Sequence, residues 1–218
     1  MWGLLSRKTQ VFVIGGLAII LAWGIEGAAS LFTGNSPPSL KLISLVVVII
    51  SSGLAAVASA VWRKIWKRFP PVMARKLFPD LTGTWTGELI STWKNPTTGE
   101  AIAPIPVTIW IRQGIFSTSI KLCTGESTSY STRCLLEADP EAGRFRFWYS
   151  YDNNPRAEYR YRSARHEGVA WLELDIDTDP ERLVGYYYTD RKTSGDIDVR
   201  RVKNRVERGH VAAARSKA

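Results

Sequence analysis

Two long apolar runs near the N-terminus limit the folds open to this chain more than any other feature of the sequence. The first, at residues 11–32, is interrupted only by Glu26, and the second, at residues 42–62, carries no charged residue. A helix needs about 20 apolar residues to cross a bilayer. A Pro-Pro pair lies between the runs and breaks any continuous helix. Residues 1–66 therefore predict a hairpin of two transmembrane helices.

Basic residues around the two runs predict the orientation of this hairpin. Arg7 and Lys8 precede the first run, Lys41 lies between the runs, and further Lys and Arg residues follow at residues 63–76. Because flanking segments rich in Lys and Arg stay in the cytoplasm, we expect both termini, and everything after the second run, to be cytoplasmic. The first run also fits a signal peptide cleaved near residues 27–29. In that case the second run still holds the remainder on the cytoplasmic side.

The rest of the chain changes to a period of two, which is typical of β-strands. A basic, proline-containing linker at residues 67–80 comes first, and a basic tail at residues 205–218 comes last. Short segments rich in Gly, Asn, Asp and Pro separate the apolar stretches, so neighbouring strands are expected to pair as hairpins. Strands are expected near residues 82–93, 105–113, 116–124, 128–137, 144–151, 169–176, 183–190 and 196–202.

A set of about eight short strands with one apolar face each closes into a barrel rather than leaving bare edges. Residues 81–204 therefore predict an all-β, up-and-down, eight-stranded barrel. Gly-Thr-Trp at residues 83–85, with Arg191, Arg200 or Arg201 from the last hairpin, is similar to the Gly-x-Trp and terminal-Arg closure of lipocalin-like and streptavidin-like barrels. Barrels of this size are wide enough inside for one small ligand.

Period two also predicts which side chains face the barrel interior. The predicted lumen becomes polar towards one end, where tyrosines, threonines and an arginine take inward positions. Tyrosine rings stack on bases and arginine binds phosphate through paired hydrogen bonds, so this set predicts a nucleotide site. The predicted ligand-binding residues are Tyr130, Thr132, Tyr149, Tyr151, Arg160, Tyr187, Thr189 and Arg191.

Other interpretations fit the same residues. The tyrosines also fit simple filling of the barrel, with their hydroxyls at its wet mouth, and Arg191 also fits packing against Trp85. Arg160 belongs to the Arg-rich segment 155–168, which fits a lid over the barrel mouth or a solvated loop facing anionic lipid equally well.

Charge and composition favour an anionic partner and argue against catalysis. The chain has 29 Lys and Arg against 20 Asp and Glu, a net charge of +9 that suits lipid headgroups, nucleic acid or a nucleotide. Two Cys and two His are too few for a Cys/His metal cluster, so no metal or cofactor is expected. His166 and Glu167 form the nearest acid/base pair, but no nucleophile or Gly-rich phosphate loop accompanies them. We expect a binding protein rather than an enzyme.

The layout and one motif together resemble a known family. The two N-terminal spans, LTGTWTGEL at residues 81–89, HEGVA at residues 166–170 and above all LVGYYYTDRKTSGDIDV at residues 183–199 are similar to the two-transmembrane, β-strand-rich effectors of CBASS, the cyclic-oligonucleotide-based antiphage signalling systems. The resemblance covers essentially the whole chain. It implies a minimal β-barrel that binds a cyclic dinucleotide made by a cGAS-like CD-NTase upon infection.

The same resemblance implies the outcome of binding. The chain is expected to oligomerise and its spans to disrupt the inner membrane, which kills the infected cell before phage mature. The implied partners are the cyclic dinucleotide, inner-membrane lipids and further copies of the chain, with no DNA or RNA. Two other functions stay open: a membrane-anchored, lipocalin-like carrier or scaffold for an apolar ligand, and a membrane-bound hydrolase, which needs a nucleophile that the sequence does not offer.

Overall fold

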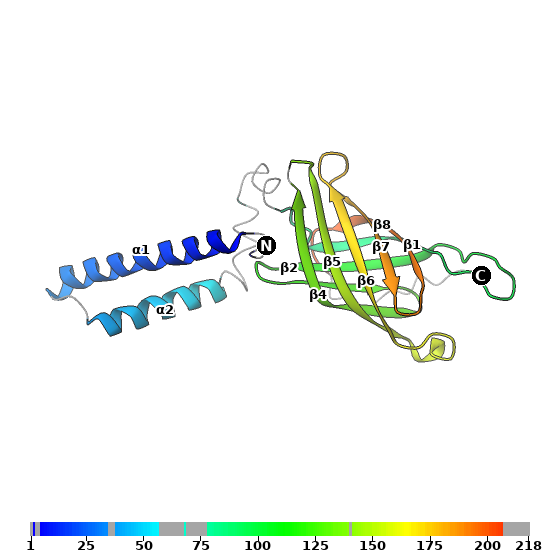
Figure 1. Ribbon diagram of the computed structural model, residues 1–218, viewed down its shortest axis with the longest axis horizontal. Coiled ribbons are helices and arrows are strands. Elements are labelled where there is room, and N and C mark those ends of the chain that lie inside the picture. The colour runs from blue at the N-terminus through cyan, green and yellow to red at the C-terminus, as the bar shows by residue number, and fades with distance from the viewer. Residues whose placement is uncertain are drawn as a thin grey trace. The chain divides into compact units, whose positions relative to one another are not determined.

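The computed structural model describes residues 2, 5–34, 38–56, 68, 78–139 and 141–206. Within these ranges the chain forms two apolar helices followed by eight strands, in a helical unit and a barrel unit (Figure 1). Parts of three predicted segments lie outside the described residues. These are residues 57–62 of the second span, 67 and 69–77 of the basic linker and 207–218 of the tail.

Helices α1 (Arg7–Thr33) and α2 (Ser39–Ala56) make up the helical unit. The Ser6 hydroxyl caps the start of α1 by accepting a hydrogen bond from the Thr9 amide, and Gly34 ends the helix in a left-handed conformation, with φ at 69°. Among the described residues, 7–32 form the one helix that is long and apolar enough to cross a membrane, whereas the apolar part of α2, at 39–53, is shorter.

The eight antiparallel strands form a closed barrel in chain order (Figure 1). Each strand pairs with the next, and the last pairs back with the first, so the closed sheet has no free edge. The predicted eight-stranded up-and-down barrel preceded by two helices is confirmed. The strands are β1 (Gly83–Ser91), β2 (Ile105–Gln113), β3 (Thr118–Cys123), β4 (Ser127–Asp139), β5 (Arg144–Pro155), β6 (His166–Asp175), β7 (Arg182–Thr189) and β8 (Ser194–Lys203).

Residues 78–82, which precede β1, pack into one end of the barrel. Phe78 is fully buried and its ring meets Phe145 edge-on, with the ring centres 5.4 Å apart. The buried Gln113 side chain holds this segment: its Oε1 accepts a hydrogen bond from the Leu81 amide at 2.7 Å, and its Nε2 donates to the Pro79 carbonyl at 3.2 Å. We call this the closed end of the barrel.

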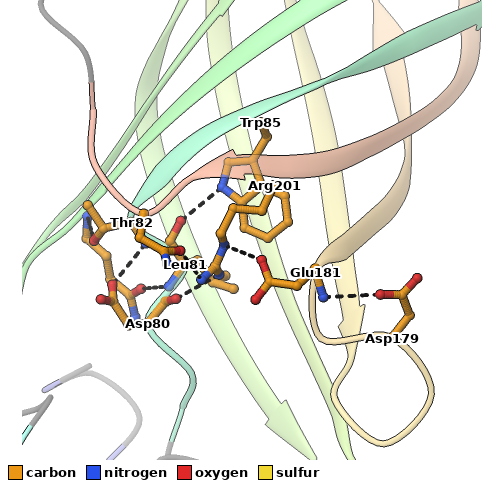
Figure 2. Close-up of polar contacts among 9 residues, drawn as sticks. Asp80, Leu81, Thr82, Trp85, Asp179, Glu181 and Arg201 are labelled. Carbon is orange, nitrogen blue, oxygen red and sulfur yellow. Dashed lines mark hydrogen bonds and ion pairs between the residues drawn. The ribbon is translucent and has the colours of Figure 1, made fainter.

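Trp85 and Arg201 complete the closed end (Figure 2). The indole Nε1 of Trp85 donates to the Leu81 carbonyl at 3.1 Å, and the Arg201 guanidinium lies 4.5 Å from the centre of the indole ring. Arg201 also donates to the Asp80 carbonyl at 2.8 Å and pairs with the Glu181 carboxylate at 3.4 Å. The Gly-Thr-Trp motif therefore has its arginine partner in β8.

Only one of the three arginines considered for this closure occupies the position over Trp85. Arg200, the neighbour of Arg201, forms an ion pair with Asp179 at 2.7 Å instead. Arg191 follows β7 and lies at the opposite end of the barrel. The interpretation of Arg191 as a packing partner of Trp85 is therefore wrong.

A β-bulge in β4 changes which residues of this strand face inward. Ser131 lies opposite Tyr151 of β5, whereas Arg133 lies opposite Ser150, so Thr132 is an extra residue between them. Before the bulge Ser129 and Ser131 occupy the inner face, and after it the even-numbered residues do.

The inward facing predicted for Tyr130 and Thr132 is wrong, because the prediction continued one alternation through this bulge. Tyr130 is 54% exposed, and Thr132 is exposed and hydrogen-bonds to the outward-facing Ser150 at 2.7 Å. Beyond the bulge, Cys134 and Leu136 take the inner face and are half-buried.

Strands β5 and β6 are longer than the sequence predicted. β5 continues beyond Tyr151 to Pro155, and β6 begins at His166 rather than at Val169. The segment that joins them is therefore shorter than predicted. It comprises residues 156–165 and contains a short 3-10 helix, η3 (Ala157–Tyr159). We call residues 156–165 the cap segment.

Candidate functional site

A cavity of about 660 Å³ occupies the end of the barrel opposite the closed end. Ligand pockets in proteins commonly measure about 300–1,000 Å³. The cavity is lined by the last residues of β1, β3, β5 and β7 and by the first residues of β2, β4, β6 and β8, together with adjoining loops. We call this the open end.

The cavity has two chemically different walls. Because the strands close in sequence order, β1 and β2 lie across the barrel from β5 and β6. The first wall is mainly apolar and the second carries most of the polar side chains. The apolar wall includes Leu89, Ile105, Leu122 and Ile197, and the polar wall includes Ser129, Tyr149, Tyr151, Asn153, His166, Tyr187 and Thr189.

Tyr149 and Tyr151 place two aromatic rings inside the barrel. Their ring centres are 5.9 Å apart and the rings are inclined at 46°. The Tyr151 hydroxyl donates to the Tyr188 carbonyl at 3.3 Å. Burial raises the pKa of both phenols far above the usual value, so both hydroxyls stay protonated at neutral pH.

Glycines on the neighbouring strands make room for two of the tyrosine rings. Gly168 lies opposite Tyr151, and a Cβ at this position would overlap the tyrosine hydroxyl. Gly195 lies opposite Tyr187, and a Cβ there would come within 2.8 Å of the ring. The rings therefore lie flat across glycine positions on adjacent strands, which fixes their orientation towards the cavity.

Two arginines stand at the mouth of the cavity. Arg191 donates from Nη1 to the Ser163 hydroxyl of the cap segment at 3.1 Å. Arg162, in the cap segment itself, donates from Nη2 to Glu126 at 2.6 Å. The cap segment thus contributes Arg162 and Ser163 to the lining of the open end. Both cations are placed where an anionic ligand would enter.

A further ion pair joins the cap segment to β5. Arg165 donates from Nε to Asp152 Oδ1 at 2.8 Å. This hydrogen bond from Arg165 holds the pKa of the Asp152 carboxyl below its usual value. Because the pair is exposed, it adds little stability, but it leaves the cap segment attached to the barrel wall.

Three buried polar side chains lie side by side on the polar wall. Ser129, Asn153 and His166 face one another across β4, β5 and β6. The Ser129 hydroxyl donates to Asn153 Oδ1 at 2.7 Å, and His166 Nδ1 lies 3.0 Å from the Ala164 carbonyl. Burial lowers the pKa of His166, with the positive charge of Arg191 adding to the effect. His166 is therefore neutral at pH 7.

The structure brings together five of the eight predicted site residues. The three others do not line the cavity. Tyr130 and Thr132 face outward, as described above, and Arg160 is exposed on the cap segment, where it donates to the Pro155 carbonyl at 3.3 Å. The five at the cavity are Tyr149, Tyr151, Tyr187, Thr189 and Arg191.

Sequence reasoning missed Ser129 and Asn153 as lining residues, and it considered Arg162 and His166 only within the Arg-rich segment 155–168 and, for His166, as part of an acid/base pair. Asp-Asn-Asn-Pro at residues 152–155 is typical of turns, so the sequence predicts a turn rather than a strand at Asn153. The alternation from Phe145 through Tyr151 to Asn153 carried the signal, since it continues the inner face of β5 without a break.

Comparison with known proteins shows which family this chain is similar to. Residues 76–201, more than half of the chain, match the model of the family described as Cap15, cyclic dinucleotide receptor domain. A curated relative, CD-NTase-associated protein 15 of Staphylococcus schleiferi, is 30% identical over 98 residues, which are 44% of this chain and 50% of the relative. The matching part therefore spans about half the length of that relative.

Proposed function

The chain belongs to the Cap15 cyclic dinucleotide receptor domain family, and on that premise we propose that its open-end cavity binds a cyclic dinucleotide made by a cognate CD-NTase. The family confirms the resemblance to CBASS effectors that the sequence suggested. In this proposal the chain acts as a receptor whose ligand signals infection, and it performs no catalysis.

One observation carries the proposal: a cavity of about 660 Å³ combines tyrosine rings with arginines at its mouth. A cyclic dinucleotide has two bases and two phosphate charges. Tyr149, Tyr151 and Tyr187 offer faces on which bases stack, and Arg191 offers a guanidinium for a phosphate. Arg162 is a second cation, and a phosphate can replace Glu126 as its partner, because both are anionic acceptors.

Binding is tested with the full-length chain in lipid nanodiscs, titrated by calorimetry with a panel of cyclic di- and trinucleotides. We expect one or more cyclic dinucleotides to bind. Arg191→Ala should weaken binding about 10- to 100-fold, since it removes a charge-assisted contact, and Tyr187→Ala should also weaken it. Arg133→Ala is the matched control, because Arg133 is exposed on the outside of β4.

Absence of binding to every member of the panel would overturn the proposal. Bound lipid in native mass spectra, together with indifference to all cyclic nucleotides, would instead favour the carrier of an apolar ligand. The apolar wall formed by Leu89, Ile105, Leu122 and Ile197 is the feature that such a carrier would use.

We extend the proposal to the membrane. Large apolar side chains of α1 are exposed, among them Phe12, Trp23 and Phe32. Such a surface needs lipid or other protein around it. In the proposed mechanism both helices lie in the inner membrane, with both chain termini and the barrel on the cytoplasmic side, and ligand binding gathers many helical pairs until the bilayer fails.

The outer face of the barrel offers a surface for this assembly. Leu135, Val169 and Tyr188 are exposed on β4, β6 and β7, and in the strand register Trp148 and Trp171 continue the row from Leu135. Exposed apolar patches of this kind commonly mark protein contacts. We assign the face to contact with a second copy of the chain in the ligand-bound state.

Assembly and membrane damage are tested separately from binding. Saturating cyclic dinucleotide should increase the sedimentation coefficient of the detergent-solubilised chain, and the double variant Leu135→Ser, Tyr188→Ser should reduce the increase. Ser119→Ala, on the outside of β3, is the control. Vesicles that contain the chain should release an enclosed dye when the ligand is added. Binding without either response would remove assembly and membrane disruption from the proposal while leaving the receptor in place.

A further inference from the structure

The polar wall of the cavity carries a cluster whose hydrogen-bonding groups are only partly used. Ser129, Asn153 and His166 are each more than nine-tenths buried and line the cavity. They occupy matching positions on three neighbouring strands, so their side chains form one row. A buried row of polar groups is costly unless partners satisfy it.

The contacts of the row fix the direction of its hydrogen bonds. The Ala164 carbonyl only accepts, so His166 Nδ1, which lies 3.0 Å from it, carries a hydrogen. The neutral ring then leaves Nε2 as an acceptor. Asn153 Oδ1 accepts from the Ser129 hydroxyl, which orients the amide so that Nδ2 lies 3.5 Å from His166 Nδ1. Asn153 Nδ2 and His166 Nδ1 are therefore both donors, and no hydrogen bond joins them.

The cluster consequently offers an amide N–H donor beside a ring-nitrogen acceptor. Every nucleobase has a donor next to an acceptor on its Watson–Crick edge, and proteins read bases through such edges. The positions of this donor and acceptor relative to the glycosidic bond differ from base to base, so a donor and an acceptor fixed in a cavity favour one base over the others. The charged groups that act on His166 are Arg191, Asp190 and Asp152. Arg191 and Asp190 lie in the turn after β7, and Asp152 lies in β5. None of these charged groups therefore belongs to the opposite wall of the cavity.

The opposite wall has a different character. Leu89, Ile105 and Leu122 present apolar side chains, which can contact the face of a base but cannot read its edge. The Ser91 hydroxyl on the same wall accepts a hydrogen bond from the Trp93 amide at 3.1 Å. A single chain forms the barrel, so the row of Ser129, Asn153 and His166 occurs once around this cavity.

We propose that the cavity reads the identity of only one of the two bases of a cyclic dinucleotide, through Asn153 and His166, with Ser129 as a positioning residue for Asn153. The other base lies against the apolar wall and is accepted with little selection. This inference rests on the proposed function, because it requires that a cyclic dinucleotide binds.

The test compares cyclic dinucleotides that differ only in their bases and have the same type of phosphodiester linkage. The four symmetrical cyclic dinucleotides are first ranked with the full-length chain in nanodiscs, which identifies the preferred base X and a poor base Y. The mixed ligand XY is then measured. With one reading site, XX and XY should bind within about threefold of each other, and YY should bind at least about tenfold more weakly.

Two results would overturn the inference. Equal affinities for XX, XY and YY would mean that neither base is read. A large difference between XX and XY, in either direction, would mean that both bases are read. These outcomes leave the proposed receptor function standing, whereas failure of the wild-type chain to bind any cyclic dinucleotide would overturn both.

Variants connect the selectivity to the cluster. Asn153→Ala should lower the affinities for XX and XY by about tenfold or more, to the level of YY, and leave YY within about threefold. Asn154→Ala, at the next, exposed position of the same strand, should change none of the three. Thermal unfolding reports whether each variant folds. Ser129→Ala makes a smaller change and should reduce the preference for X in part. An equal loss for all three ligands in the folded variants would contradict reading by this cluster.

Discussion

At the closed end of the barrel Phe78, Leu81 and Trp85 are at most 1% exposed, whereas at the open end the inward side chains leave a cavity of about 660 Å³. The same eight strands build both ends. The closed end is completed by residues 78–82, which the chain supplies from its own preceding segment, while the cavity stays at the end where the strands reach the cap segment. Packing at one end thus leaves the other free for a ligand.

The polar side chains at the two ends differ in the same way. At the closed end Gln113 and Arg201 bind main-chain groups of residues 79–81. At the open end Arg191 contacts one hydroxyl of the cap segment, and Asn153 and His166 meet at only 3.5 Å. Polar groups whose donors and acceptors are satisfied within the protein stabilise the fold. Polar groups with unused donors or acceptors can form hydrogen bonds to a ligand. The comparison predicts that stability and binding respond to different residues.

The largest difference is expected between two leucines. Leu81→Ala at the closed end removes a side chain that is 1% exposed and should lower the free energy of unfolding by about 3 kcal/mol, which includes the cost of a new cavity. Leu122→Ala borders the existing cavity and should cost about 1 kcal/mol, mainly the lost transfer of methyl groups. Chemical denaturation of the full-length chain, followed by tryptophan fluorescence, gives both values.

Leu135→Ala is the control for both leucines. The Leu135 side chain is 62% exposed on the outside of β4. Its replacement by Ala should therefore change the free energy of unfolding by less than about 0.5 kcal/mol. If Leu81→Ala and Leu122→Ala cost the same, the two ends do not differ in packing as the comparison requires.

Two arginines should show opposite effects. Arg201→Ala removes the hydrogen bond to Asp80 and the contact with Trp85, and should lower the free energy of unfolding by about 2 kcal/mol. Arg191→Ala, at an exposed position, should leave stability within about 0.5 kcal/mol and instead weaken ligand binding. Denaturation and ligand titration on both variants check this. A stability loss for Arg191→Ala equal to that of Arg201→Ala would contradict the division of roles.

Gly168→Ala tests the way the open end positions its aromatic rings. The new Cβ would overlap both the Tyr188 carbonyl and the Tyr151 hydroxyl, so the strand or the ring must move. We expect a loss of about 1–2 kcal/mol in the free energy of unfolding, with a change in ligand affinity. Gly125→Ala is the matched control, since no atom lies within 4 Å of its Cβ position. Equal stability of both variants would show that Tyr151 is not held by this contact.

The sequence was sufficient for the barrel because its alternation is long and regular in most strands. Val107, Ile109 and Ile111 of β2 and Ala170, Leu172 and Leu174 of β6 are all buried, as period two predicted. The Gly-Thr-Trp motif also predicted an arginine partner, although spacing could not choose Arg201 over Arg191. That choice depends on which strand ends meet in the closed barrel.

The site was predicted less completely, for two physical reasons. The bulge at Thr132 reverses the facing of half of β4, and a bulge depends on pairing with β5 rather than on local composition. Asn153 and His166 lie in segments that resemble turns, yet pairing extends β5 and β6 through them. Tyr149, Tyr151 and Tyr187, by contrast, lie within regular alternation, and their inward facing followed from the sequence.

The smallest expected effect concerns the charge of His166 at the open end. Burial, aided by Arg191, lowers the pKa of His166 in the folded chain, whereas the unfolded chain has the ordinary value of about 6.5. As the pH falls through about 6.5, the unfolded chain binds a proton more readily than the folded chain. The free energy of unfolding should therefore decrease between pH 7.5 and 5.5, by a fraction of the roughly 1.4 kcal/mol per pH unit that one proton can contribute.

Denaturation at both pH values, on the wild type and on His166→Gln, isolates the contribution of His166 to the pH dependence of the free energy of unfolding. The variant should lose less stability than the wild type over the interval, whatever its stability at pH 7.5. Asp152 and Asp198, whose pKa values are lowered by their arginine partners, respond below this interval, because carboxylates have an ordinary pKa near 4. An equal pH response in the two proteins would show that burial at the open end does not lower the pKa of His166.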